Sequence, residues 1–195
     1  MIPEDWRGVG YTPSMAVQRN DVVPTLHTDR LLLRAFSRAD IPALVPLIGA
    51  REVAATTLRI PHPYSAKDAE VLFAKCETGD ELRWAVTLLD GTLIGGVGLR
   101  LERDHNRGEL GYWIGVPYWG NGYATEAARA VVQYGFDVLN LHRIQASHFS
   151  NNPASGALLR KIGMKHEGTL RQHILKWGQR LDLEVYAILG SESAS

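Results

Sequence analysis

Apolar residues recur along this chain with two different periods, which separate helical from extended segments. Where they return every three to four positions the pattern predicts an amphipathic helix, and where they form short runs or alternate with polar residues it predicts a strand. One predicted helix follows Asp40 and carries Leu44, Leu47 and Ile48 on one face. The other predicted helices cover about residues 65–77, 121–139 and 153–162, and the predicted strands cover residues 30–36, 82–89, 92–101, 107–116, 142–149, 164–175 and 181–189.

Capping and turn residues stand at the ends of these segments. Asp40 is placed to cap the first helix. Ser65, with Asp68 three residues later, forms a weaker variant of the capping box for the second helix. Asp90-Gly91 predicts a tight turn between two strands, and Gly163 predicts the end of helix 153–162.

The order of the elements, β-α-α-β-β-β-α-β-α-β-β, predicts an α/β fold with a mixed, mostly antiparallel sheet. Hairpins in the middle of the chain and near Trp177-Gly178 give antiparallel pairs, while a helical crossover links the strands near residues 110 and 145. A chain of 195 residues fits one domain. We expect an N-terminal arm over residues 1–24, one domain over residues 25–190 and a flexible polar tail over residues 191–195.

Charge and cysteine content narrow the classes of function. Lys plus Arg equals Asp plus Glu, at 21 each, which disfavours a broad basic face for nucleic acid. The single cysteine, Cys76, excludes an internal disulfide, and its apolar helical setting suggests a packed residue. The chain has no apolar run of about eighteen residues, and its first residues are not those of a secretory signal. We therefore expect a cytoplasmic protein with no nucleic-acid or membrane partner.

The segment that leads from strand 107–116 into helix 121–139 carries the most specific signal. Gly120 and Gly122 leave backbone amides open to a ligand, and the start of the helix adds unpaired amides and the positive end of its dipole. Together they form an anion site suited to a pyrophosphate. The segment lacks the Gly-Lys-Ser/Thr of a nucleotide phosphate loop and the third glycine of a dinucleotide fingerprint. A tight turn without a ligand is the alternative.

Several longer motifs follow one another along the chain. They are Thr28 to Arg34, Leu93 to Leu99, Glu109 to Ile114, Tyr118 to Ala127, Asn152 to Ser155 and Leu159 to Met164. On these residues the chain resembles, from about Leu26 to Leu189, the GNAT N-acetyltransferases, and within them the ribosomal-protein N-terminal acetyltransferase group. The resemblance implies a GNAT-like fold with splayed central strands, acetyl-CoA (CoA) as co-substrate and an amine as acceptor.

The resemblance also implies how the co-substrate lies. Strands 107–116 and 142–149 splay apart, and the pantetheine arm pairs with the backbone near Ile114 and Val116. The pyrophosphate lies on the amides of the following loop, whose predicted binding residues are Trp119, Gly120, Asn121, Gly122, Tyr123, Ala124 and Thr125. Trp119 departs from the general family pattern, which has Gln or Arg there, although tryptophan is familiar in the subgroup. Backbone amides carry most of the recognition.

Acetyl transfer to an amine needs a group that removes the amine proton and a donor for the leaving thiolate. Glu109 is the first candidate for the base or for holding a water relay. Alternatively, Glu109 is a solvated strand residue or pairs with Arg107 or Arg100. Alternation places the odd-numbered residues of strand 107–116 on one face and the even-numbered residues on the other, and leaves open which face lines the slot.

Asn152 and Ser155 match the family's Asn-x-x-Ser. The resemblance implies that Asn152 hydrogen-bonds the co-substrate arm and that Ser155 donates a proton near the sulfur. Asn152 is also a good N-cap for helix 153–162, and both roles can coexist. We interpret the aromatic residues beside the slot, Tyr112, Trp113, Tyr118 and Tyr123, as core or wall. The scattered histidines have no metal-binding spacing, so no metal site is predicted; His173 belongs to the last hairpin, which often borders the acceptor pocket in the family.

The sequence thus predicts an acetyl-CoA-dependent N-acetyltransferase that acts by direct attack, without a covalent enzyme intermediate. The acceptor is a primary amine, either the N-terminal amine of a (ribosomal) protein or a small molecule. The alternatives are a non-catalytic acyl-CoA-binding module and a nucleotide hydrolase, the latter disfavoured by the missing phosphate-loop residues. A monomer and a homodimer are both compatible with the sequence.

Overall fold

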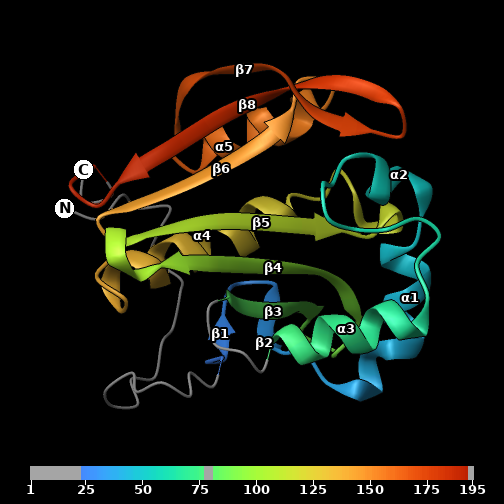
Figure 1. The fold of residues 1–195 in the computed structure, drawn as a ribbon. Coiled ribbons are helices and arrows are strands. Elements are labelled where there is room, and N and C mark those ends of the chain that lie inside the picture. Colours follow the sequence, from blue (N-terminus) through green and yellow to red (C-terminus); the bar gives the residue numbers. More distant parts are fainter. Residues whose placement is uncertain (1–22, 77–80, 193–195) are drawn as a thin grey trace.

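A mixed sheet forms the centre of the protein (Figure 1). The structure is a computed structural model that describes residues 23–76 and 81–192. Within these residues the sheet has eight strands, in the order β1-β2-β3-β4-β5-β6-β8-β7. Their bounds are β1 Leu26–His27, β2 Leu31–Ala35, β3 Glu81–Leu88, β4 Leu93–Glu102, β5 Arg107–Ile114, β6 Arg143–Phe149, β7 Lys165–Lys176 and β8 Gln179–Leu189.

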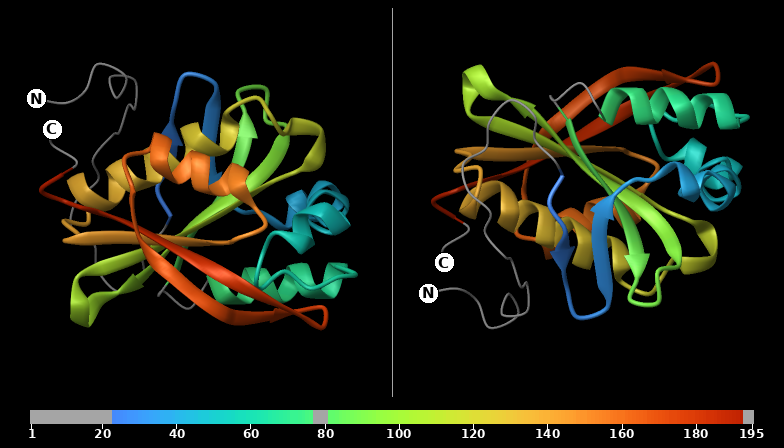
Figure 2. Two further views of the ribbon diagram at one scale, coloured as in Figure 1. Left: turned by 90° about the horizontal axis from the view of Figure 1, so that it is seen from above. Right: turned by 90° about the horizontal axis from the view of Figure 1, so that it is seen from below.

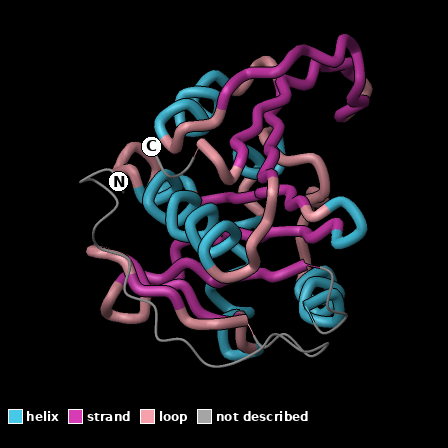
Figure 3. The backbone as a smooth tube through the Cα atoms, turned by 90° about the vertical axis from the view of Figure 1, so that its left-hand side faces the viewer, coloured by secondary structure: helices cyan, strands magenta, loops and turns pink. Residues whose placement is uncertain are grey.

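Helices cover both faces of the sheet, as the two views of Figure 2 and the side view of Figure 3 show. Helix α4 packs on β4 and β5 and against α5, whereas α1 and α3 lie on the opposite face. The bounds are α1 Ile41–Ile48, α2 Arg51–Ala55, α3 Ala66–Cys76, α4 Tyr123–Asp137 and α5 Pro153–Lys161, with 3-10 turns η2 Arg38–Asp40, η3 Arg103–His105 and η4 Val116–Tyr118.

Two apolar clusters fill the spaces between the sheet and its helices. The larger lies on the α4 side and includes Trp84, Leu99 and Ile144, which are fully buried. The smaller lies under α1 and α3 and includes Phe73 and Ala85. Since alternate residues of a strand face opposite sides, the neighbours Trp84 and Ala85 of β3 belong to different clusters. The sheet is therefore buried on both faces where helices cover it.

The predicted α/β fold is confirmed, and each predicted helix and strand is present to within a few residues of its expected ends. The capping box forms, because the Ser65 amide donates to Asp68 Oδ2 at 2.8 Å and the Asp68 amide to Ser65 Oγ at 3.4 Å. Gly91 closes the β3–β4 turn with φ 88°, and Gly163 follows α5 with φ 87°. Both glycines hold the left-handed conformation that other residues avoid.

Asp40 does not cap the first helix with its side chain, contrary to the prediction. Its carboxylate accepts hydrogen bonds from Arg34 Nη1 and Nη2, at 2.8 and 2.7 Å, and from the Ser37 amide at 2.7 Å. Ser37 instead begins the 3-10 turn η2 that leads into α1, and it forms a capping box with Asp40. Burial alone raises the pKa of Asp40, but the hydrogen bonds from Arg34 and Ser37 outweigh it and hold the pKa below its usual value.

Two short elements, β1 and α2, were not predicted, because stretches of two and five residues are too short to display a period. The N-terminal arm lies almost wholly outside the described residues, as does the side chain of Cys76. The expected domain boundaries therefore stay a prediction. Among residues 23–76 and 81–192, no helix has the length and apolarity needed to cross a membrane.

The sheet opens between β5 and β6, the one parallel pair in the described part of the chain. These strands pair at Arg107 with Arg143, at Gly108 with Ile144 and at Glu109 with Gln145, and beyond those three pairs they diverge. Strand β6 continues along β8 to Phe149, and β5 continues along β4 to Ile114. A slot through the sheet therefore begins just after Glu109.

Candidate active site

A cavity of about 850 Å³ passes along this slot and is lined from both faces of the sheet. On the α4 side its walls come from β5, the loop before α4, β6 and α5, and on the other side from residues 56–60 and β3. Most of the predicted site residues line it, namely Glu109, Ile114, Trp119, Gly120, Gly122, Tyr123, Ala124, Thr125, Asn152 and Ser155. Val116, Asn121 and His173 are not among the lining residues.

The loop before α4 has the geometry of an anion cradle. Gly120 and Gly122 adopt φ of 78° and 81°, which turns the chain sharply into the helix. No side chain of the described residues caps α4, and its first helical bond runs from the Glu126 amide to the Gly122 carbonyl. The amides of residues 123–125 therefore have no partner inside the helix, and they lie at the positive end of its dipole. Such a helix start fits the pyrophosphate of acetyl-CoA.

Arg30 fixes this loop from a distant part of the chain. Its Nη1 donates to the Asn121 carbonyl at 3.0 Å, and its Nε donates to Glu126 Oε2 at 2.7 Å. The Thr28 hydroxyl donates to the other oxygen of Glu126 at 2.6 Å, and the guanidinium lies 4.8 Å from the centre of the Tyr123 ring. Sequence analysis did not assign Arg30 a role, although Thr28 to Arg34 was one of the family-like motifs. The contact places a cation beside the loop that has Trp119 in place of Gln or Arg.

Trp119 acts through its indole nitrogen. Its Nε1 donates to the Ile114 carbonyl at 2.6 Å, and the Asn121 side chain donates to the Trp119 carbonyl at 3.1 Å. These bonds hold the loop closed on the end of β5. The bond from Trp119 also occupies one lone pair of the Ile114 carbonyl oxygen, so a second donor there must use the remaining lone pair.

A pair of hydroxyl groups meets on the α4 side of the slot. Tyr112 Oη lies 2.6 Å from Ser155 Oγ, and the Ser155 amide donates to Asn152 Oδ1 at 3.3 Å. Asn152 thus caps α5, as one of its two interpretations expected. Burial raises the pKa of Tyr112 to about 12, although the hydrogen bond with Ser155 works in the opposite direction. Tyr112, which sequence analysis had treated as a wall residue, therefore presents a neutral hydroxyl beside Ser155.

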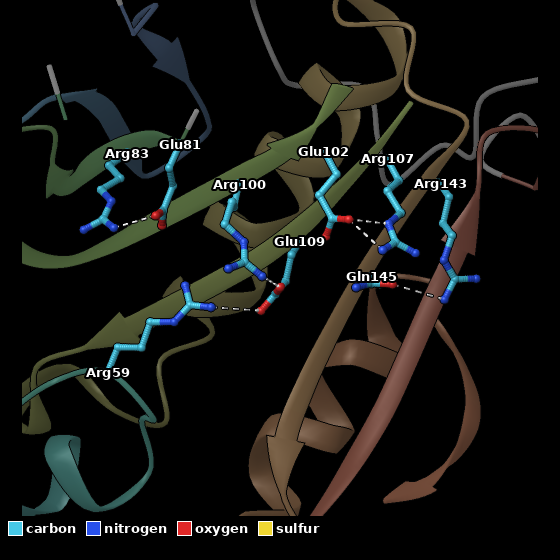
Figure 4. A network of polar contacts seen from close by, with 9 residues as sticks. All are labelled: Arg59, Glu81, Arg83, Arg100, Glu102, Arg107, Glu109, Arg143 and Gln145. Carbon is cyan, nitrogen blue, oxygen red and sulfur yellow. Dashed lines mark hydrogen bonds and ion pairs between the residues drawn. The ribbon is translucent and has the colours of Figure 1, made fainter. Parts of the chain in front are cut away.

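Glu109 lies on the opposite face of the sheet from Tyr112, because the two residues are three positions apart in β5. Figure 4 shows its carboxylate between two arginines. Its Oε2 contacts Arg100 Nη2, and its Oε1 lies 4.0 Å from Arg59 Nη2. Arg107 pairs with Glu102 instead, so of the two partners considered for Glu109 from sequence, Arg100 is the one found. Even-numbered residues of β5 face α4 and odd-numbered residues face the other side, and the cavity reaches both.

The histidines form no metal centre in the part of the chain that the structure describes, where no group of three His, Cys, Asp or Glu side chains is placed to hold an ion. His148 lines the cavity and is buried, with Nδ1 2.8 Å from the Phe149 carbonyl oxygen. Lys176, near the tip of the β7–β8 hairpin, donates to the Thr57 carbonyl at 2.8 Å. The hairpin thereby holds the segment 56–60 that lines the cavity.

Comparisons with known proteins show the family of the chain. Residues 30–165 match the acetyltransferase (GNAT) domain family. The chain is 36% identical over 172 residues to the N-acetyltransferase YoaA of Bacillus subtilis, which covers 85% of this chain and 97% of YoaA. It is 37% identical over 73 residues to the ribosomal protein uS5-alanine N-acetyltransferase of Escherichia coli, which covers 37% of this chain and 38% of that one.

A solved acetyltransferase structure has a similar fold. The spermidine N-acetyltransferase of Vibrio cholerae, in complex with CoA and spermine, superposes with a TM-score of 0.76 and 28% sequence identity, over 85% of this chain and 98% of that chain. The protein belongs to the GNAT acetyltransferase family. It is an acetyl-CoA-dependent N-acetyltransferase whose acceptor is an amine.

Proposed function

We propose that the protein transfers acetyl from acetyl-CoA to a primary amine by direct attack through the slot between β5 and β6, and that the amine is the N-terminal amine of a protein. The observation that carries the proposal is the cavity that joins two chemically different faces of the sheet. One face offers an anion cradle and a hydroxyl pair, and the other offers the carboxylate of Glu109.

On the α4 side, the amides of residues 120–125 would hold the pyrophosphate, and the backbone of Ile114 and Val116 would pair with the pantetheine arm. Asn152 would bond that arm while its Oδ1 caps α5. Acetyl-CoA supplies the acetyl group and a thiolate leaving group. The hydroxyl pair of Tyr112 and Ser155 is placed to donate a hydrogen bond to the developing thiolate, with Ser155 as the donor and Tyr112 orienting it.

On the opposite face, Glu109 is the proposed base or the holder of a water that takes the proton of the amine. Both of its carboxylate oxygens face guanidinium groups, those of Arg100 and Arg59, so we favour the water relay. A neutral amine is needed for attack, and a relay at this position lies where the slot begins. A residue of the last hairpin such as His173 is the alternative base.

The charges on that face support one class of acceptor. The relatives named above act on the alanine of a ribosomal protein and on spermidine, which differ in charge. Glu81 and Glu109 are the carboxylates that line the described cavity, and each already contacts an arginine. A polyamine would have to displace those arginines, whereas an N-terminal amine followed by peptide carbonyls would not. This supports a protein N-terminus as the acceptor.

An acceptor screen with a matched variant tests the proposal. N-terminal peptides, polyamines, amino acids and aminoglycosides would be supplied with acetyl-CoA, and CoA release measured. We expect turnover with peptides, and Glu109→Gln should lower kcat about a hundredfold or more with acetyl-CoA affinity nearly unchanged. Full turnover of Glu109→Gln across the pH range would remove Glu109 from the mechanism. A protein that binds acetyl-CoA but turns over no acceptor would be the non-catalytic binding module.

A further inference from the structure

Two glycines form the floor of a recess on the Glu109 face of the cavity. Gly98 of β4 and Gly111 of β5 pair directly across the sheet, and both line the cavity. A Cβ built on Gly111 would meet no heavy atom of the described residues within 4 Å, and Gly111 is exposed although it lies in the middle of a strand. The recess starts two residue pairs beyond Glu109, where β5 and β6 have separated.

Three guanidinium groups and two carboxylates lie at or beside the recess (Figure 4). Arg83 lines the cavity and is the strand neighbour of the floor residue Gly98. Arg100 is the strand neighbour of Glu109, and it lies beside the recess without lining the cavity. Arg59 reaches the same place from the segment 56–60. The carboxylates of Glu81 and Glu109 face these three cations.

These ion pairs leave donors of the guanidinium groups uncommitted. In the described part of the chain, Arg83 contacts Glu81 through Nη2 at 2.5 Å, Arg100 contacts Glu109 through Nη2, and Arg59 is 4.0 Å from Glu109. A guanidinium carries several N–H donors arranged as a fork that matches a carboxylate. Arg83 and Arg100 each use one nitrogen in these contacts, and Arg59 is too far from Glu109 for a hydrogen bond. The side chain of Arg59 is 56% exposed and is the cation held most loosely.

Apolar surface closes the remaining sides. Trp113 follows Gly111 on the same face of β5 and packs beneath α1 and α3, and Leu58 and Ile60 of the segment 56–60 also line the cavity. Lys176 holds this segment by donating to the Thr57 carbonyl. The recess thus combines a narrow floor and apolar walls with Arg59, whose charge remains after Arg83 is paired with Glu81 and Arg100 with Glu109. A hydrogen bond from a guanidinium to a carboxylate is charge-assisted and is therefore stronger than one between neutral groups.

We propose that this recess takes an acceptor that carries a carboxylate close to its amine. The amine lies over Gly111 at the mouth of the slot, and the carboxylate accepts hydrogen bonds from Arg59 and Arg83. Two sources share this chemistry, an acidic side chain near the N-terminus of a peptide and the carboxylate of a free amino acid. The inference rests on the proposed acetyl transfer and deepens it by specifying the charge of the acceptor.

Pairs of acceptors that differ only in a carboxylate or an amide test whether the recess prefers a negative charge. A peptide that begins Ala-Glu would be compared with one that begins Ala-Gln, and alanine with alaninamide, with kcat and KM measured at saturating acetyl-CoA. The carboxylate member of the preferred pair should have a kcat/KM about tenfold or more above its amide, mainly through KM. The peptide pair and the amino acid pair tell the two sources apart.

Two variants test whether Arg59 and Gly111 form the site that binds the acceptor. Arg59→Met should abolish the preference for the carboxylate over the amide acceptor, chiefly by raising KM for the carboxylate member. Arg38→Met is the control, because Arg38 is similarly exposed, pairs with Glu70 and lies outside the cavity lining. Gly111→Ala should fold normally, since its Cβ meets open space, and should lower kcat/KM for the acceptor without changing acetyl-CoA affinity.

The outcomes separate this inference from the proposed function. Equal kcat/KM for the carboxylate and amide members, a preference for spermidine, or a preference that survives Arg59→Met would overturn the inference while acetyl transfer stands. An absence of turnover with every acceptor, in a protein that binds acetyl-CoA, would refute the proposed function and this inference with it.

Discussion

Replacing Tyr112 by phenylalanine removes one hydroxyl from the α4 side of the slot and keeps the ring. That hydroxyl lies 2.6 Å from Ser155 Oγ, and burial keeps it neutral by raising the pKa of Tyr112 to about 12. If the pair stabilises the departing thiolate, the loss is that of a hydrogen bond to a charged group, about 1.5–3 kcal/mol. Tyr112→Phe should therefore lower kcat by about ten- to a hundredfold, with little change in the acetyl-CoA dissociation constant.

The contact between Tyr112 and Ser155 also predicts how the effects of removing each hydroxyl combine. If Tyr112 acts by orienting Ser155, then Tyr112→Phe, Ser155→Ala and the double variant should lower kcat by similar factors, because each breaks the same chain of hydrogen bonds. The assay is CoA release at saturating acetyl-CoA and acceptor, with calorimetry of acetyl-CoA binding as the control for the co-substrate site. Losses that multiply in the double variant would refute the idea that the hydroxyls act as a unit, and full activity of Tyr112→Phe would remove it from the mechanism. Since Tyr112 stays neutral below about pH 11, the ratio of wild-type to variant kcat should be constant between about pH 6 and 10.

Three further changes test the loop and the fold. Gly122→Val should weaken acetyl-CoA binding about tenfold or more, and because Gly122 has φ 81° a parallel unfolding experiment is needed to separate strain from lost binding; unchanged affinity in a folded variant counts against the cradle. Arg30→Met frees the Asn121 carbonyl, so calorimetry should show weaker acetyl-CoA binding, whereas wild-type affinity would mean that the loop keeps its shape unaided. Asp40→Asn breaks the pair with Arg34 and should lower the free energy of unfolding by about 1–3 kcal/mol at neutral pH. The folded pKa of Asp40 is depressed, so its stabilisation is present above the unfolded pKa of about 3.9 and is lost as the pH falls through the lower folded value. Chemical denaturation should therefore show a difference from wild type that shrinks below about pH 4, and a pH-independent difference would contradict the assignment.

Local patterns predicted the elements well, because the residues that decide them are neighbours in sequence. Ser65 and Asp68 lie three residues apart and form the expected cap. Asp40 shows the limit of such reasoning. It has the right residue type for a cap, but Ser37 begins the turn three residues earlier and β2 brings Arg34 against the Asp40 carboxylate, which no helical pattern reveals.

In the candidate site, too, some features could be predicted from local sequence and others depend on the packing of distant elements. The glycines of the cradle were predictable because the turn and the helix start are contiguous in sequence. The contact between Tyr112 and Ser155 spans 43 residues, and that between Arg30 and Glu126 spans 96, so both depend on how β5, α4 and α5 pack. Alternation within β5 assigned its residues correctly to two faces of the sheet. The alternation could not show that β5 and β6 separate after Glu109 and that the cavity is lined from both faces.

The central claim is that the protein carries acetyl from acetyl-CoA through the slot to a primary amine without an acetylated enzyme. The most direct measurement is CoA release with and without a peptide acceptor, with the masses of peptide and protein followed in the same reaction. We expect CoA release that requires the acceptor, one acetylated peptide formed for each CoA, and no acetyl group on the protein in single turnovers. CoA released at the same rate without acceptor, or an acetylated protein that forms and decays at the rate of turnover, would contradict it.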